Sequence, residues 1–107
     1  MASLAGIQAA KQTPALIPLC HHVALSSVDV DVDCAAGDGL VRVLCTARAA
    51  DRTGVEMEAM TGASVAALAV VDMCKGAAGG KGIVVESVRL LRKEGGKSGT
   101  WIAPGFE

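Results

Sequence analysis

The best candidates for chemistry are charged residues at the two ends of one long apolar segment, residues 53–75. Asp72 and Lys75 stand three residues apart, so on a helix their side chains share a face and can meet. Such a pair is either a surface ion pair near a helix C-terminus, which is the commoner case, or a lysine held beside a carboxylate for proton transfer. The spacing favours the first interpretation and leaves the second open.

Glu56 and Glu58 stand at the other end of the same segment. Glu56 follows Thr53 by three residues, which fits a capping box at least as well as a binding role. Glu58 has no such capping role, and two acids two residues apart cannot share one helical face. We therefore expect one of these carboxylates to point away from the other.

Three other polar patterns give weaker signals. The run Cys-His-His at 20–22 suggests a metal, but adjacent residues of an extended loop point opposite ways and no further ligand has suitable spacing, so we expect no metal site. The aspartates that alternate with valine over 28–33 are most simply a solvated strand face. The run Lys-Glu-Gly-Gly-Lys-Ser-Gly at 93–99 could cradle phosphate with its backbone N–H groups, although its spacing is not that of a Walker motif.

Hydrophobic periodicity and glycine or proline breaks predict the elements that position these groups. They are a helix over residues 2–12, a strand over 28–33, a Gly-Asp-Gly turn at 37–39, a strand over 40–48, a helix over about 56–77 and a strand over 83–93. The order predicts an α+β fold, a ferredoxin-like split βαβ sandwich with helices on one face of an antiparallel sheet and the first strand truncated. The long helix is apolar nearly all the way round, so we expect a second subunit to cover part of it.

Length and charge set further limits. The 107 residues predict one domain, residues 1–107. The net charge of -1 gives no electrostatic reason to expect nucleic acid or an anionic membrane as partner. The uncharged stretches are too short for a membrane span, and the N-terminus resembles no secretory signal, so we expect a soluble, non-secreted protein. The four scattered cysteines predict free, mostly buried thiols.

Five blocks of the chain, in order, closely resemble the cyclic pyranopterin monophosphate synthases, which make an intermediate of the molybdenum cofactor. They are Ala5–Lys11, Leu16–His21, Thr53–Ala59, Asp72–Lys75 and Gly95–Gly99. The resemblance implies the ferredoxin-like fold and a lyase that converts 3′,8-cyclo-7,8-dihydroguanosine triphosphate to cyclic pyranopterin monophosphate with release of pyrophosphate. It also implies a homohexamer, a trimer of dimers, with sites at subunit interfaces, and a radical S-adenosylmethionine GTP cyclase upstream.

The resemblance also assigns roles to residues. Asp72 and Lys75 match catalytic residues. Substrate-binding residues of the family are matched by Lys11, His21, Glu56, Glu58 and Lys97. No resident metal or other cofactor is expected, and Mg²⁺ would enter through the substrate triphosphate. The expected location is the cytoplasm, or the mitochondrial matrix in a eukaryote.

Two expectations concern activity. Members of the family usually carry an earlier Arg-His-His-Lys-Gly segment with another catalytic lysine, so we expect this short form to be poorly active unless that lysine comes from elsewhere. The alternative is a truncated, inactive paralogue that serves as an assembly or regulatory subunit. A helix also separates Glu58 from Asp72 by about 20 Å, so we expect each site to combine the start of one subunit's helix with the end of a neighbour's.

Overall fold

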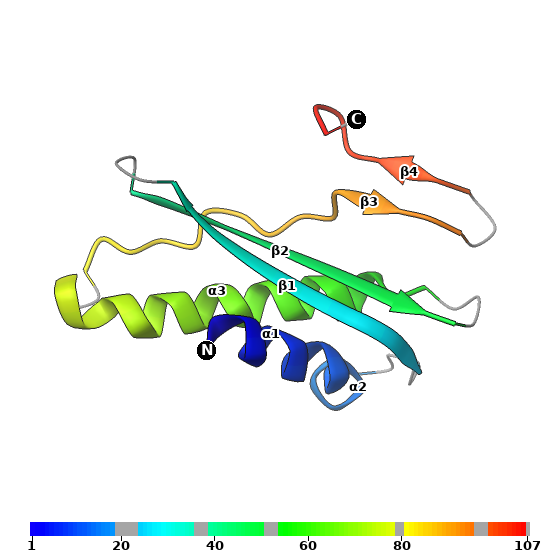
Figure 1. Ribbon diagram of the computed structural model, residues 1–107, viewed down its shortest axis with the longest axis horizontal. Helices are drawn as coiled ribbons and strands as arrows, with labels where there is room; N and C mark the ends of the chain where they lie inside the picture. Colours follow the sequence, from blue (N-terminus) through cyan, green and yellow to red (C-terminus); the bar gives the residue numbers. More distant parts are fainter. Residues whose placement is uncertain (19–23, 36–38, 51–53, 79–80, 96–98, 107) are drawn as a thin grey trace.

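The computed structural model describes residues 1–18, 24–35, 39–50, 54–78, 81–95 and 99–106. Figure 1 shows helices packed on one side of a long β-hairpin, with a small second hairpin near the C-terminus. The elements are α1 (Ala2–Lys11), α2 (Thr13–Leu16), β1 (Leu25–Ala35), β2 (Leu40–Ala49), α3 (Glu56–Ala78), β3 (Arg92–Lys93) and β4 (Trp101–Ile102).

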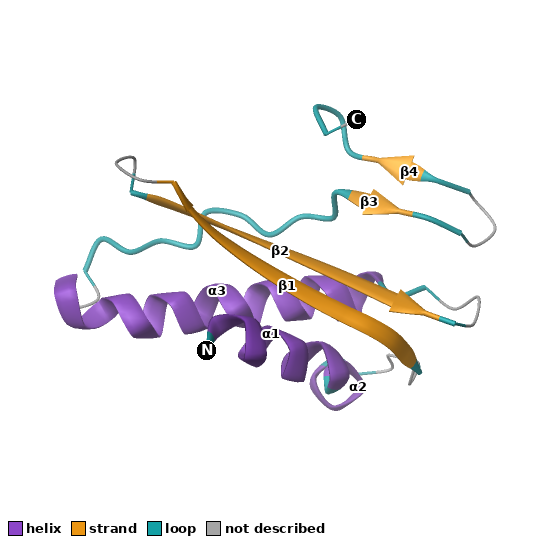
Figure 2. Cartoon of the chain, in the orientation of Figure 1, coloured by secondary structure: helices purple, strands orange, loops and turns teal. Residues whose placement is uncertain are grey.

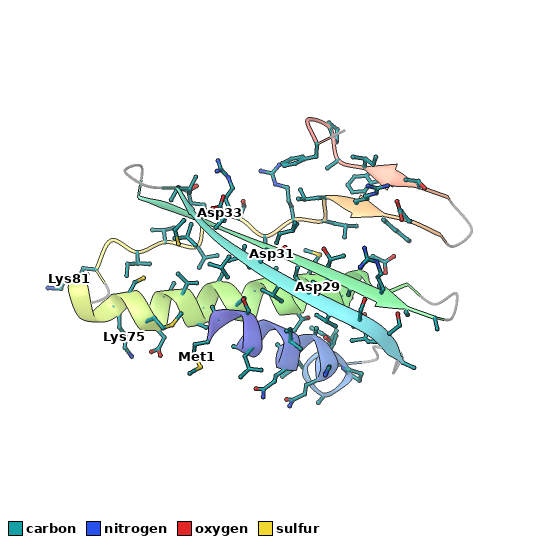
Figure 3. The ribbon with its side chains drawn as sticks, in the orientation of Figure 1. Met1, Asp29, Asp31, Asp33, Lys75 and Lys81 are labelled. Atoms are coloured by element: carbon teal, nitrogen blue, oxygen red, sulfur yellow. The ribbon has the colours of Figure 1, made fainter. Side chains whose placement is uncertain are left out.

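The β1–β2 hairpin confirms the pairing predicted from the Val-Asp alternation. The two strands are antiparallel, with Asp31 opposite Leu44 and Val30 opposite Cys45. Because side chains alternate across a strand, Val30 faces the helices and is buried, while the aspartates are exposed. The solvated acidic face is therefore confirmed, and Figure 3 shows its three aspartates spaced along β1.

Helices α1 and α3 lie side by side on the inner face of this sheet (Figure 2). They approach closely because each has a glycine at the contact. A Cβ on Gly6 would lie 2.8 Å from the backbone oxygen of Gly62 and 3.0 Å from Ala66 Cβ. The small side chains Ala9, Ala10 and Ala66 are all buried. This close packing lets a chain with few aromatic residues form a core.

A short second helix, which the proline positions did not predict, follows α1 at once. Pro14 lies in the first turn of α2, where a missing N–H is tolerated. The fully buried Thr13 joins the two helices, since its hydroxyl donates to the backbone oxygen of Ala10 at 2.9 Å. This bond satisfies a carbonyl at the end of α1 and fixes the turn that carries Lys11.

Helix α3 begins at Glu56, as predicted, and packing within this chain covers only part of its apolar surface. Residues 56–76 pass, by length and composition alone, as a helix able to cross a membrane, but core helices pass the same test. One side of α3 packs on α1 and on β2, where Glu58 and Ala66 are buried. Its outer side leaves Met57, Leu68 and Met73 exposed, which agrees with an apolar surface that extends beyond the sheet side.

The predicted strand over 83–93 is wrong for most of its length. Only Arg92 and Lys93 form a strand, and their partner is the tail, with Lys93 opposite Trp101. A strand is defined by ladder hydrogen bonds to a neighbour, and the structure gives residues 83–90 no ladder bonds to the described strands. Val84 and Val88 in this segment are exposed. Valine content alone therefore could not make a strand here.

The fold class is confirmed as α+β, with helices on one face of an antiparallel sheet, an arrangement consistent with a ferredoxin-like split βαβ unit. The described strands form two separate two-stranded sheets, β1–β2 and β3–β4. The β3–β4 hairpin turns through Gly95 and Gly99, both at positive φ (79° and 75°), a conformation that favours glycine.

Candidate active site

The start of α3 brings several of the predicted site residues to one end of the molecule. Helix α1 runs antiparallel to α3, so its last turn, with the exposed Lys11, lies beside the first half of α3 (Figure 1). Ala10 is next to Gly62, and a Cβ on Gly62 would be 3.4 Å from Ala10 Cβ. Lys11 thus shares an end of the fold with Glu56 and Glu58.

Glu56 lies in the first turn of α3 and pairs with Lys93 of β3. Lys93 Nζ is 2.7 Å from Glu56 Oε1, and both side chains are partly buried. The hydrogen bond from Lys93, followed by one from the backbone of Glu56 itself, lowers the pKa of this carboxyl from its ordinary value of 4.5. Glu56 is therefore a carboxylate at neutral pH. As an acid at a helix N-terminus it also interacts favourably with the helix dipole.

The backbone hydrogen bonds at the start of α3 place Glu56 in the first helical position, and the capping-box alternative for Thr53 and Glu56 stays a prediction. The first helical hydrogen bond runs from the amide of Ala59 to the backbone oxygen of Val55 at 3.0 Å. Val55 is therefore the N-cap residue. Thr53 itself is outside the described residues.

Glu58 points away from Glu56, as predicted from their spacing. Its residue is only 2% exposed, whereas Glu56 is partly exposed and reaches Lys93. A buried carboxylate needs hydrogen bonds or an opposite charge to offset its desolvation. Among the described residues no buried side-chain oxygen or nitrogen lacks a hydrogen bond. Its predicted role in substrate binding stays a prediction.

Asp72 and Lys75 meet at the other end of α3. Lys75 Nζ is 2.7 Å from Asp72 Oδ1, so the pairing expected from their spacing forms. Both side chains are exposed, 62% for Lys75 and 70% for Asp72. The hydrogen bond to Asp72, and then its negative charge, raise the pKa of Lys75 above its ordinary value of 10.5. Within this chain Lys75 is an ammonium at neutral pH and a proton donor.

The two groups of residues are far apart along one continuous helix. Fourteen residues separate Glu58 from Asp72, which at the α-helical rise is about 21 Å. Figure 3 places Lys75 near the C-terminal end of α3, which extends past Met1 at the start of α1. The chain therefore brings Lys11, Glu56 and Glu58 together at one end and places Asp72 and Lys75 at the other.

Two predicted site residues, His21 and Lys97, lie outside the described residues, as does the whole Cys-His-His run at 20–22. Over the part of the chain that is described, no group of three or more His, Cys, Asp or Glu side chains is arranged to hold a metal ion. The roles predicted for these two residues stay predictions.

The structure adds two residues that the sequence did not single out for this site. Lys93 was considered only as part of a glycine-rich phosphate loop, and its partner is Glu56 instead. Gly54 lies under the same carboxylate, since a Cβ there would be 2.7 Å from Glu56 Oε1 and nearer still to Oε2. A glycine two residues before a helix could have suggested a close approach. No sequence signal pairs Lys93 with Glu56.

Comparisons with known proteins agree with this arrangement of motifs. The sequence model of the MoaC family matches residues 1–96. The chain is 59% identical over 101 residues to the cyclic pyranopterin monophosphate synthase of Pelobacter propionicus and 58% identical to that of Geobacter sulfurreducens. Each match covers 94% of this chain and 62% of the relative, so the chain spans about 62% of the length of these curated relatives. Because the family model matches residues 1–96 and the chain is 59% identical to the Pelobacter propionicus protein, the chain belongs to the MoaC family.

Proposed function

We propose that this chain acts as a lyase of molybdenum cofactor biosynthesis. Its substrate would be 3′,8-cyclo-7,8-dihydroguanosine triphosphate, and its products cyclic pyranopterin monophosphate and pyrophosphate. Membership of the MoaC family supports this proposal. The observation that carries it is the direct contact of Asp72 with Lys75, 2.7 Å from Oδ1 to Nζ, at the positions of the family motif.

Lys75 would transfer protons as the substrate ring opens and closes again. A lysine is protonated at neutral pH even at its ordinary pKa of 10.5, and Asp72 raises that pKa further, so Lys75 can first act as a general acid. Asp72 accepts a hydrogen bond from the ammonium and so orients it. After giving up its proton, the neutral amine can take one from a later intermediate.

Water would have to be excluded from this pair, and we propose that a neighbouring subunit does so. Leu68 and Met73, in the same half of α3, are 59% and 53% exposed, an apolar surface that a second copy could cover. Burial there would lower the pKa of Lys75 toward the working pH. In a hexamer built as a trimer of dimers, each site would combine the start of one α3 with the end of another.

The start of α3 would bind the substrate. Lys11, with Lys97, would pair with the triphosphate, and positive charge there would stabilise the departing pyrophosphate. Glu56 and Glu58 would accept hydrogen bonds from the guanine-derived ring and the ribose, and His21 would donate or accept one. Mg²⁺, where needed, would arrive with the triphosphate, and a radical S-adenosylmethionine GTP cyclase would supply the substrate.

The test is pyrophosphate release from the cyclic triphosphate by the chain and by two variants, Lys75→Ala and Asp72→Asn. Loss of a positioned acid–base group costs roughly 10²- to 10⁴-fold in rate, so we expect at least a hundredfold loss for Lys75→Ala. Lys81→Ala is the matched control, because Lys81 is an exposed lysine beyond the end of α3. Full activity in both Lys75→Ala and Asp72→Asn would overturn the catalytic assignment.

A second function, an assembly or regulatory subunit, is distinguished by the same assay. The exposure of Asp72 and Lys75, and their distance from Glu56, are compatible with a chain that completes its site with another polypeptide. In that case the chain alone would release no pyrophosphate. It would instead restore activity to a longer family member mutated at its Asp-Met-Cys-Lys motif.

A further inference from the structure

The Glu56–Lys93 ion pair differs from the Arg48–Asp29, Lys75–Asp72 and Arg92–Glu94 ion pairs. Its side chains are 29% and 37% exposed, whereas those of the other pairs are 58–70% exposed. It also joins two separate elements, the first turn of α3 and strand β3. Partial burial reduces the screening that makes most surface pairs weak. This pair therefore constrains its side chains more than the others do.

The Glu56 carboxylate is held from several sides. Lys93 Nζ donates to Oε1 at 2.7 Å, and the backbone of Glu56 itself supplies a second hydrogen bond. Below it lies Gly54, whose missing Cβ leaves the space that the two carboxylate oxygens fill. The side chain is thus fixed in one conformation over the start of the helix before any ligand binds. A preorganised acceptor loses less conformational entropy when a ligand donates to it.

We propose that Lys93 is a positioning residue of the substrate site. It holds the Glu56 carboxylate ionised and oriented, so that the free lone pairs of that carboxylate accept hydrogen bonds from the ligand. The inference rests on the proposed function, because it takes Glu56 to contact the substrate. Lys93 acts through Glu56, whereas Lys11 and Lys97 are the lysines expected at the triphosphate.

The first test is an NMR titration of the Glu56 side-chain carboxyl. In Lys93→Met the pKa of Glu56 should rise toward its ordinary value, and in Lys93→Arg it should stay low, because arginine keeps the charge and can donate in the same direction. Arg92→Met is the matched control, since the neighbouring Arg92 pairs with Glu94 and not with Glu56. An unchanged Glu56 titration in Lys93→Met would overturn the proposal.

The second test measures ligand affinity by calorimetry, with GTP as the probe. Without Lys93 to orient it, the Glu56 carboxylate loses a charge-assisted hydrogen bond to the ligand, so Lys93→Met should bind GTP roughly tenfold more weakly. Lys93→Arg and Arg92→Met should bind GTP as the unmodified chain does. In a Glu56→Gln background, Lys93→Met should have no further effect, since the lysine acts only through Glu56. A full additional tenfold loss in that background, or no loss in Lys93→Met itself, would refute positioning.

Gly54→Ala provides a second, independent variant. The atoms that a new Cβ would meet belong to the carboxylate end of the Glu56 side chain and not to the backbone, so the fold should tolerate the change while the carboxylate is pushed out of its position beside Lys93. We expect an unaltered unfolding midpoint together with a loss of GTP affinity similar to that of Lys93→Met. Unaltered affinity would contradict the fixed carboxylate.

In turnover of the cyclic triphosphate, Lys93→Met should raise KM roughly tenfold and change kcat little, as expected for a contact that serves binding alone. A chain that releases no pyrophosphate would count against the proposed function. The NMR and GTP measurements would still decide the role of Lys93, so the two failures are distinguishable.

Discussion

The substitution Gly62→Ala tests the packing of α1 on α3 that brings Lys11 beside the start of α3. A Cβ at position 62 would lie 2.7 Å from Cys45 Sγ and 3.0 Å from the backbone oxygen of Gly6. The Cys45 side chain can rotate, but the oxygen of a helical backbone cannot, so α1 and α3 must move apart. Overpacking of this kind costs about 1–3 kcal/mol, and the higher helix propensity of alanine offsets about 1 kcal/mol.

We therefore expect Gly62→Ala to lower the free energy of unfolding by about 1 kcal/mol, within a range of about 0–2 kcal/mol, measured by urea denaturation followed by circular dichroism. Gly76→Ala is the control, because a Cβ on Gly76, in the same helix, has no neighbour within 4 Å. That change should raise stability by up to about 1 kcal/mol. Each kcal/mol corresponds to about 4–8 °C in Tm for a domain of this size.

A second comparison separates the effect of the Cys45 contact from that of the Gly6 contact. Cys45→Ala should partly rescue Gly62→Ala, because it removes the closer atom and leaves the Gly6 oxygen in place. If Gly62→Ala proves as stable as Gly76→Ala, α1 and α3 do not approach closely enough for a Cβ at position 62 to clash. The position inferred for Lys11 would then lose its support.

Three further predictions concern titration and reactivity. Ellman's reagent should modify the exposed Cys34 and Cys74 before Cys45, because burial, and then the charge of Asp29, raise the pKa of the Cys45 thiol. Asp29→Asn should speed the reaction of Cys45. Equal rates at Cys45 in the variant and the unmodified chain would contradict this prediction. Asp72→Asn should lower the pKa of Lys75 toward 10.5, seen in the ¹⁵N signal of its ammonium, without moving the urea midpoint. Because folding lowers the pKa of Glu56, the stability that this carboxylate contributes is present above pH 4.5 and is lost as the pH falls through the lowered value. Urea unfolding across this pH range should show a smaller loss of unfolding free energy for Lys93→Met than for the unmodified chain. An equal loss in the two chains would refute the assignment of the lowered pKa to Lys93.

The parts of the fold that followed from the sequence are those set by local pattern. Strict alternation of valine and aspartate fixes which face of β1 is wet, and the charged ends of residues 56–75 mark the limits of α3. Residues 83–90 have the composition of a strand, but strand formation depends on a partner, which composition does not reveal. The prediction of mostly buried thiols was wrong for Cys34 and Cys74, since apolar neighbours in sequence do not determine burial at the end of a strand or helix.

The candidate site also contains one contact that local sequence pattern predicts and one that it does not. The Asp72–Lys75 contact follows from helical spacing, because three residues place two side chains on one face. The Glu56–Lys93 contact joins residues 37 positions apart through the return of the chain after α3, and no local pattern encodes it. Helical spacing predicted that the side chains of Glu56 and Glu58 point in different directions. It did not predict which of them is buried, because that depends on where α1 packs.

The length of α3 gives the last prediction, which concerns how complete sites form. The helix is continuous from Glu56 to Ala78, so Glu56 and Lys75 of one chain stay about 28 Å apart along its axis. If each site combines the start of one α3 with the end of another, two impaired variants can complement each other. In a one-to-one mixture of Glu56→Gln and Lys75→Ala chains, random assembly leaves both residues intact in about one quarter of the sites. Under conditions in which the unmodified chain turns over, the mixture should therefore release pyrophosphate well above the mean of its two parents. Activity no higher than that mean, after the subunits have been exchanged by unfolding and refolding together, would mean that the two ends of α3 do not meet in shared sites.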